Sequence, residues 1–163
     1  MQTRKHRLSK ENYIGRNIYF ITIDTNGDYF KDEEAIYKIR DILNNTAKKY
    51  RITNLLTVFM IDHMHLILRG ESEDSNLKRC IKTFKSLASI AVKNKNFWHK
   101  DFYDHIIRNE KSLSKIIRYT LENPVRKGYV KNYKEWEFSF SEMYKLEEFA
   151  NIYYDASLDI TTL

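Results

Sequence analysis

A short apolar run that contains two histidines constrains this chain more than any other segment. Residues 61–68 read Ile-Asp-His-Met-His-Leu-Ile-Leu. This pattern predicts a buried strand, in which successive side chains point to opposite faces of a sheet. His63 and His65 would then share one face, and Met64 and Leu66 would point to the other. Two imidazoles so placed can converge on one cation, and the alternative is that they are satisfied core histidines.

The composition fits one compact domain with an anionic partner. The chain has 163 residues, of which 42% are hydrophobic and 14% aromatic, and this is sufficient for one core. The net charge of +6 favours nucleic acid over membrane, because no long apolar run or amphipathic anchor accompanies it. A generically basic, soluble protein is the alternative. With one cysteine, Cys80, and no signal or spanning segment, we expect a reducing cytoplasm and no disulfide framework.

The order of the expected elements predicts an α+β fold, a ferredoxin-like sandwich. Strands are expected over residues 17–24, 55–60, 61–68 and 102–108, and amphipathic helices over residues 32–50, 75–91 and 111–122. This order predicts an antiparallel sheet with two helices on one face and the last helix available for the other. We divide the chain into a basic N-terminal arm (1–12), a catalytic domain (13–141) and a C-terminal tail (142–163).

Tyr119 and Asn123 form a second chemical clue, because residues four apart are neighbours on one helical face. A tyrosine with an ordinary pKa of about 10 is a poor nucleophile unless a cation or base stabilises the phenolate. A divalent ion held by His63 and His65 would do so, with the amide oxygen of Asn123 as a candidate third ligand. Any one of twelve tyrosines is more often a packing residue, so the hypothesis depends on the combination.

In their order and spacing these residues resemble the HUH single-tyrosine transposases, and especially the REP-associated tyrosine transposases. The segments that carry the resemblance, within about residues 13–141, are His63-Met64-His65, the block from Trp98 to Arg108, Ile117-Arg118-Tyr119 before Asn123-Pro124-Val125, and a trailing Trp136 with Phe138 and Ser139. The chain departs from the family at Ile61-Asp62, where the family often has proline followed by a polar residue. This departure affects the turn and leaves the ligands in place.

The resemblance implies a site and a reaction. His63, His65 and Asn123 would bind a divalent metal ion, Mg²⁺ or Mn²⁺, and Tyr119 would be the nucleophile. Imidazole ligands suit Mn²⁺ better than Mg²⁺, and Zn²⁺ stays open. The implied activity is DNA transposition, by cleavage and joining of single-stranded or hairpin DNA through a 5′-phosphotyrosine. The implied protein is a monomer or homodimer in the bacterial cytoplasm, associated with the nucleoid when it binds DNA, and without a membrane partner.

Basic residues distributed along the chain are candidates to hold the DNA backbone. They are Arg4, Lys5 and Arg7 in the arm, Lys82 and Lys85 on the second expected helix, and Arg108, Arg118, Arg126 and Lys127 around the third. Any one of them can equally be a solvated surface charge.

Two other functional classes stay open on the sequence alone. A non-catalytic single-strand binding module could use the same sandwich with a basic, aromatic sheet face, but it leaves His63, His65 and Tyr119 unexplained. A metal-dependent phosphodiesterase could use the same ion to activate water instead of the phenol.

Overall fold

A five-stranded antiparallel sheet organises the structure, a computed structural model that describes residues 8–153. The strands are β1 (Ile18–Thr25), β2 (Ile52–Phe59), β3 (His63–Gly70), β4 (Trp98–Ile107) and β5 (Ser139–Phe140). The helices are α1 (Glu33–Lys49), α2 (Leu77–Ala91), α3 (Glu110–Leu121), α4 (Asn123–Arg126) and α5 (Leu146–Tyr153), with 3₁₀ turns η1 (Lys10–Tyr13), η2 (Tyr29–Lys31) and η3 (Tyr133–Glu135). The order of the strands across the sheet is β4-β1-β3-β2-β5.

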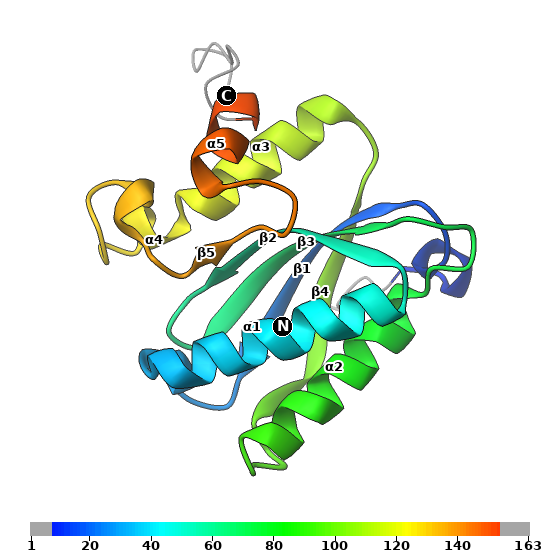
Figure 1. Ribbon diagram of the computed structural model, residues 1–163, viewed down its shortest axis with the longest axis horizontal. Coiled ribbons are helices and arrows are strands. Elements are labelled where there is room, and N and C mark those ends of the chain that lie inside the picture. The colour runs from blue at the N-terminus through cyan, green and yellow to red at the C-terminus, as the bar shows by residue number, and fades with distance from the viewer. Residues whose placement is uncertain (1–7, 154–163) are drawn as a thin grey trace, which may run out of the picture.

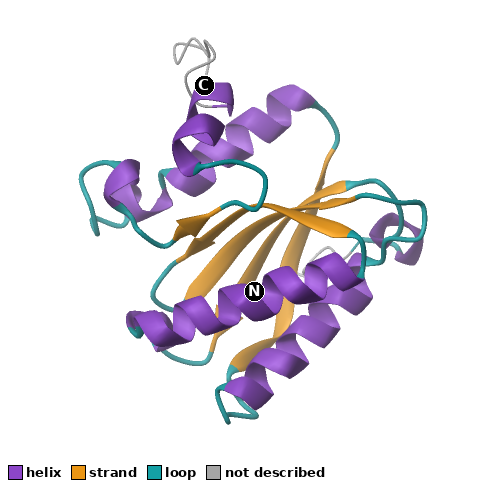
Figure 2. Ribbon diagram, viewed as in Figure 1, coloured by secondary structure: helices purple, strands orange, loops and turns teal. Residues whose placement is uncertain are grey.

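The predicted ferredoxin-like sandwich is confirmed. The four long strands follow the order β4-β1-β3-β2, and every neighbouring pair is antiparallel. Figure 1 shows α1 and α2 on one side of the sheet and α3, α4 and α5 on the other. Coloured by secondary structure, the sheet lies between these two helical layers (Figure 2). The last predicted helix therefore covers the face that the first two leave free.

Alternation along β3 divides its side chains between two separate cores. Met64 and Leu66 belong to the larger core under α1 and α2, which we call the α1–α2 core. Ile67 belongs to a second cluster with Leu113 and Ile117 of α3, which we call the α3 core. Because His63 and His65 have the parity of Ile67, they lie on the α3 face, as the alternation predicts.

Each of the long helices begins at a side chain that caps it. The carboxylate of Asp32 accepts from the backbone N–H of Glu34 at 3.0 Å, as expected for the start of α1. Asn76 and Asn109 cap α2 and α3 in the same way. Such caps satisfy backbone donors that have no partner within the helix.

Several elements differ from the prediction in length or were not predicted. Strand β2 begins at Ile52, and β4 begins at Trp98 instead of residue 102. The ring of Trp98 is buried, and its indole N–H donates to the carbonyl of Lys85 at 3.0 Å, which fixes the start of β4 against α2. Helix α4, strand β5 and helix α5 are too short for hydrophobic periodicity to reveal. Helix α5 lies within the predicted tail.

The division into arm, domain and tail stays a prediction. Within the described part of the chain, the end of the predicted arm is packed on the sheet: the hydroxyl of Tyr19 donates to the carbonyl of Asn12 at 2.7 Å. Tyr144 and Leu146, in the predicted tail, pack against the α3 core. Arg4, Lys5 and Arg7 lie outside the described residues.

Two chain segments approach each other so closely at Gly70 that no side chain fits there. A Cβ atom at this position would lie 1.9 Å from the carbonyl oxygen of Gly15. The backbone of Gly70 donates to the carbonyl of Asn17 at 2.9 Å, which holds the segments together. The atom that the added Cβ would meet belongs to the backbone of Gly15, so the clash can be relieved only if one of the two chain segments moves.

We therefore expect Gly70→Ala to lower the free energy of unfolding by about 3 kcal/mol, as for overpacking of a rigid site. Gly128→Ala is the matched control, because a Cβ there would meet no atom within 4 Å and only its φ of 75° is unfavourable; it should cost about 1 kcal/mol. Urea unfolding monitored by circular dichroism measures both. An equal or smaller loss for Gly70→Ala would show that the two segments separate easily.

Candidate active site

The two imidazoles of β3 lie against each other on the α3 face of the sheet. Their ring centroids are 4.9 Å apart and their planes are nearly perpendicular, at 81°. His65 is 6% exposed, and the side chain of His63 is 17% exposed. His63 therefore lies between His65 and solvent, at the end of the strand where the chain turns into β3.

Each imidazole is oriented through its Nδ1 atom by a neighbouring side chain. His63 Nδ1 lies 2.7 Å from a carboxylate oxygen of Asp62, and His65 Nδ1 lies 2.9 Å from the hydroxyl of Thr22 on β1. Partners of this kind fix the orientation of the ring and direct Nε2 away from Nδ1, toward the α3 face. The two Nε2 atoms are thus the candidate ligand atoms.

Asn123 connects the sheet to the helical layer above it. Its side-chain amide forms a short hydrogen bond with Nε2 of His65, and both residues are 6% exposed. Rotating the amide by 180° would present its oxygen, an atom that binds divalent cations, in place of its nitrogen. Asn123 opens α4, where Pro124 takes one of the first helical positions. The predicted meeting of Asn123 with the histidine strand therefore occurs.

Burial keeps His65 uncharged at neutral pH. Desolvation is the largest cause that lowers its pKa, from 6.5 to about 3, and the charges of His63 and Arg126 act in the same direction. At His63, the hydrogen bond between its ring and the Asp62 carboxyl lowers the pKa of that carboxyl. An uncharged imidazole is the form that can bind a metal ion.

Tyr119 projects from α3 into solvent. Its side chain is 53% exposed, and the guanidinium of Arg126 lies over its ring, 4.0 Å from the centroid. Arg126 also donates from Nη2 to the backbone carbonyl of Tyr119. Because the charge of Arg126 also acts on His65, the phenol and the imidazole pair share this cation as a neighbour. The phenol is accessible and lies outside the packed interior, and Arg126 is its link to the imidazole pair.

The structure brings some of the predicted DNA-binding residues to this site and leaves others on the opposite layer. Arg126 and Lys127 are exposed on and just after α4, and Lys127 is near enough to influence Asp62. Arg118 is partly buried on α3, and Arg108 is exposed at the end of β4. Lys82 and Lys85 are on α2, and Lys85 donates to the carbonyl of His99 at 2.7 Å. Those two lysines are not neighbours of the imidazoles.

Thr22 and Asp62 are the residues that the sequence reasoning missed. Thr22 is directly opposite His65 in the register of β1 and β3, and this pairing is not visible before the register is known. The signal for Asp62 was available, because a carboxylate next to a histidine is a common orienting partner. From the sequence alone, Ile61-Asp62 is interpreted only as part of the turn.

The donor set contains two imidazole nitrogens and one amide, and it fits a divalent ion that takes its remaining ligands from water or phosphate oxygens. Among residues 8–153, no group of three or more His, Cys, Asp or Glu side chains is arranged to hold a metal ion. A site here would therefore depend on Asn123 and on the substrate to complete its coordination.

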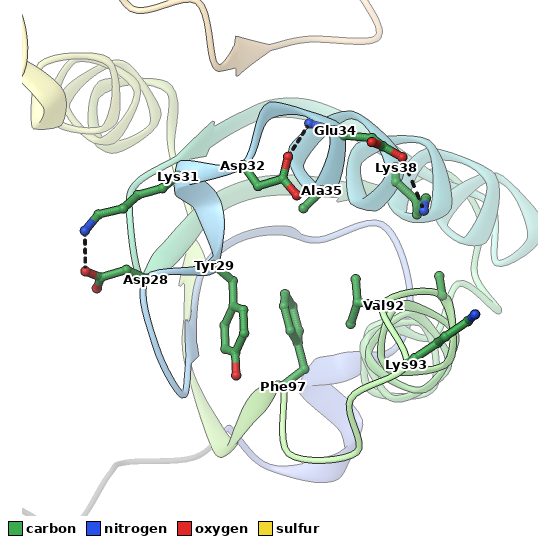
Figure 3. Close-up of a pocket in the computed structure, with 11 residues that line it drawn as sticks. Asp28, Tyr29, Lys31, Asp32, Glu34, Ala35, Lys38, Val92, Lys93 and Phe97 are labelled. Carbon is green, nitrogen blue, oxygen red and sulfur yellow. Dashed lines mark hydrogen bonds and ion pairs between the residues drawn. The ribbon is translucent and has the colours of Figure 1, made fainter.

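A surface pocket on the opposite layer has a different character. It lies between the start of α1 and the end of α2, and Figure 3 shows Tyr29, Phe97 and Val92 lining its wall. Two of its charged groups pair with each other, because Lys31 contacts Asp28 at 2.7 Å. Lys38 similarly pairs with Glu34 at 3.9 Å, and none of the lining residues belongs to the imidazole site. In the described part of the chain, the helices fall short of the length and hydropathy needed to cross a bilayer.

Two curated proteins to which the chain is similar carry the same name. No protein-family model matches the chain. The chain is 26% identical over 147 residues to a Haemophilus influenzae protein provisionally named a REP-associated tyrosine transposase, and the match covers 80% of this chain and 82% of that protein. It is 33% identical over 82 residues to the REP-associated tyrosine transposase of Escherichia coli K12, which is 50% of either chain.

A solved structure shares the fold of this chain. A solved structure of a REP-associated tyrosine transposase bound to a REP hairpin superposes with a TM-score of 0.74 at 24% identity, and the match covers 84% of this chain and 82% of that chain. The chain thus has the α+β fold of that structure, with an imidazole pair on one face of its sheet. The particular similarity is to REP-associated tyrosine transposases, as expected from the sequence.

The buried, neutral His65 predicts how stability depends on pH. The unfolded chain binds a proton at this residue below about pH 6.5, whereas the folded protein does so only near pH 3, so acid favours unfolding. Between pH 7 and 5 this residue alone should lower the free energy of unfolding by about 2 kcal/mol. His65→Gln in metal-free buffer should lose this part of the pH dependence, measured by urea unfolding at both pH values.

A variant with the wild-type pH dependence would contradict the burial of a neutral imidazole. Side-chain nitrogen chemical shifts in the wild-type protein provide a second test that needs no substitution. They should report an uncharged His65 at pH 5, and a charged ring at that pH would exclude the proposed environment.

Proposed function

We propose that this protein is a transposase-like nuclease and strand transferase that acts on single-stranded or hairpin DNA through a covalent bond to Tyr119. The observation that carries the proposal is that one cation, Arg126, lies over the exposed phenol of Tyr119 and acts electrostatically on His65, which is hydrogen-bonded to Asn123. The similarity to REP-associated tyrosine transposases supports the same activity. The solved relative is bound to a REP hairpin, which supports hairpin DNA as the partner.

In the first step, the phenol of Tyr119 gives up its proton and its oxygen attacks a phosphorus atom of the DNA backbone. The bond from phosphorus to the 3′-oxygen breaks, and that oxygen gains a proton to become a free 3′-hydroxyl. The product is a 5′-phosphotyrosine, which retains the phosphodiester bond energy. Attack by a 3′-hydroxyl on this linkage reverses the step, so the same residues can join a strand.

Arg126 has a specific part in this step. Its guanidinium is held over the ring of Tyr119 by the bond to the Tyr119 carbonyl. A fixed positive charge at this position attracts the DNA phosphate. The exposed Lys127 adds a second positive charge on the same side. Together these groups hold the phosphate near the nucleophile without contacting a base.

His63, His65 and Asn123 would hold a divalent ion, Mg²⁺ or Mn²⁺, which would withdraw charge from a phosphate oxygen when bound. Asp62 and Thr22 keep the two rings in the orientation that binding requires. The buried position of His65 excludes water from one side of the site. A dry, oriented set of donors needs little rearrangement before it can act.

We expect Tyr119→Phe to lower formation of the protein–DNA adduct by at least about a hundredfold, because the attacking oxygen is removed. The ring and its contact with Arg126 remain, so DNA affinity should stay within about twofold. The substrate is a DNA hairpin with single-stranded flanks, incubated with Mn²⁺ and resolved on a denaturing gel. Tyr129→Phe is the matched control, since that tyrosine is also exposed and stacks on Trp136.

The outcomes separate the functional classes. An adduct that persists in Tyr119→Phe would refute the assignment of the nucleophile. Cleavage by the wild-type protein without any adduct would favour a phosphodiesterase that activates water. Binding without cleavage would favour a non-catalytic single-strand binding module.

The metal assignment gives a separate prediction. A chelator should abolish adduct formation and added Mn²⁺ should restore it. His63→Ala should raise the Mn²⁺ concentration for half-maximal rate by at least about tenfold, because a ligand is lost. His99→Ala, which removes an exposed imidazole on β4, is the control and should leave the requirement unchanged. Full activity in the chelator, or an unchanged requirement in His63→Ala, would rule out this ion site.

A further inference from the structure

We propose that Phe20 and Tyr103 form a stacking platform for an unpaired nucleobase next to the imidazole site. This inference rests on the proposed function in one respect, that single-stranded DNA lies across this face of the sheet. The platform specifies where the strand is held beside the scissile phosphate. The ligand is a base of unpaired DNA, of any identity, because every base offers a flat π face.

A continuous series of rings runs across the sheet from the imidazoles to strand β4. The ring of Phe20 is stacked on His65, with centroids 5.5 Å apart and an angle of 18° between the planes. Phe20 then meets Tyr103 edge to face at 6.3 Å. The register explains the series, since Tyr103 is opposite Thr22 and Thr22 is opposite His65. All of these side chains therefore share one face of the sheet.

Tyr103 is exposed because the helical layer covers only part of this face. Helix α3 packs on Val58 of β2 and Ile67 of β3 in the α3 core. Toward the β4 edge, the side chain of Tyr103 is 49% exposed and His105 is also exposed, whereas Phe20 is half-buried. What distinguishes Tyr103 from the other exposed tyrosines is that its ring continues the series of ring contacts that begins at His65.

The distance between the platform and the imidazole site fits the spacing of nucleotides in a single strand. Tyr103 and His65 are two strands apart, which corresponds to about 10 Å across the sheet. A stacked strand covers that distance in about three nucleotides. A phosphate at the imidazole site would therefore place a nearby unpaired base over Tyr103.

Charge and continuity favour a nucleic acid as the occupant over another protein. The chain carries a net charge of +6, and the platform continues into a site whose neighbours are Arg126 and Lys127. A protein partner would need a larger apolar surface than the half-buried Phe20 and the exposed Tyr103 supply. Aromatic rings beside positive charges are the usual means of holding single strands without reading their sequence.

Binding measurements in the Tyr119→Phe background test the platform without cleavage. The probes are two fluorescent DNA hairpins, one with single-stranded flanks and one blunt, measured by anisotropy. Replacing Tyr103 with alanine should weaken binding of the flanked hairpin by about 5- to 100-fold, the range for loss of one stacked base. Binding of the blunt hairpin should change less than about twofold, because it offers no unpaired base.

Two further variants separate stacking from other effects. Tyr103→Phe keeps the ring and should bind the flanked hairpin as tightly as the parent protein. Tyr37→Ala removes another exposed tyrosine, from α1 on the opposite layer, and should bind both probes normally. The platform is excluded if Tyr103→Ala binds the flanked hairpin normally, or if it weakens both hairpins equally.

A second measurement locates the base. The fluorescent base 2-aminopurine, placed at successive positions of the flank, should be quenched at one position and released from quenching by Tyr103→Ala. Absence of quenching at every position would overturn the proposal. Because Tyr119→Phe is present throughout, failure of the covalent reaction would show only in the adduct assay, and failure of the platform would show only here.

Discussion

The hydrogen bond between His65 and Asn123 is the interaction on which the site depends. It joins the middle of the sheet to the first residue of α4, and both partners are nearly fully buried. A buried polar pair of this kind is costly to break, so it fixes the position of α4 relative to β3. Arg126 is part of the same short helix, and Tyr119 lies in the last turn of α3, the helix that precedes it. The position of the phenol therefore follows from one contact between two layers.

The sequence predicted this contact because its two halves obey local rules. Alternation along β3 assigned His63 and His65 to one face, and the spacing of Tyr119 and Asn123 assigned them to neighbouring turns. The structure differs in one respect, because Tyr119 is near the end of α3 and Asn123 begins a separate helix, α4. The rule that two helices cover one face of the sheet predicted that the helix with Tyr119 lies on the other face, which is the face of the imidazoles.

What the sequence did not reveal depends on contacts between distant segments. Thr22 orients His65 only because the register of β1 and β3 sets them opposite each other. The start of β4 at Trp98 depends on a bond to α2, and β5 forms only by pairing with β2. Lys82 and Lys85 carry the positive charge that a phosphate-binding surface needs, but α2 lies on the side of the sheet away from the imidazoles. Charge alone does not indicate on which layer a helix lies.

The existence of two separate cores has a consequence for how such a protein can diversify. The larger cluster, under α1 and α2, contains most of the fully buried side chains, whereas the reactive groups are on the opposite face. Substitutions of the exposed aromatic and basic side chains on that face leave the hydrophobic burial of the α1–α2 core intact, and this burial is the main contribution to stability. Recognition of new targets can then evolve by substitutions on this exposed face while the α1–α2 core stays unchanged. A library randomised only on the open half of the sheet should therefore contain a high proportion of folded members.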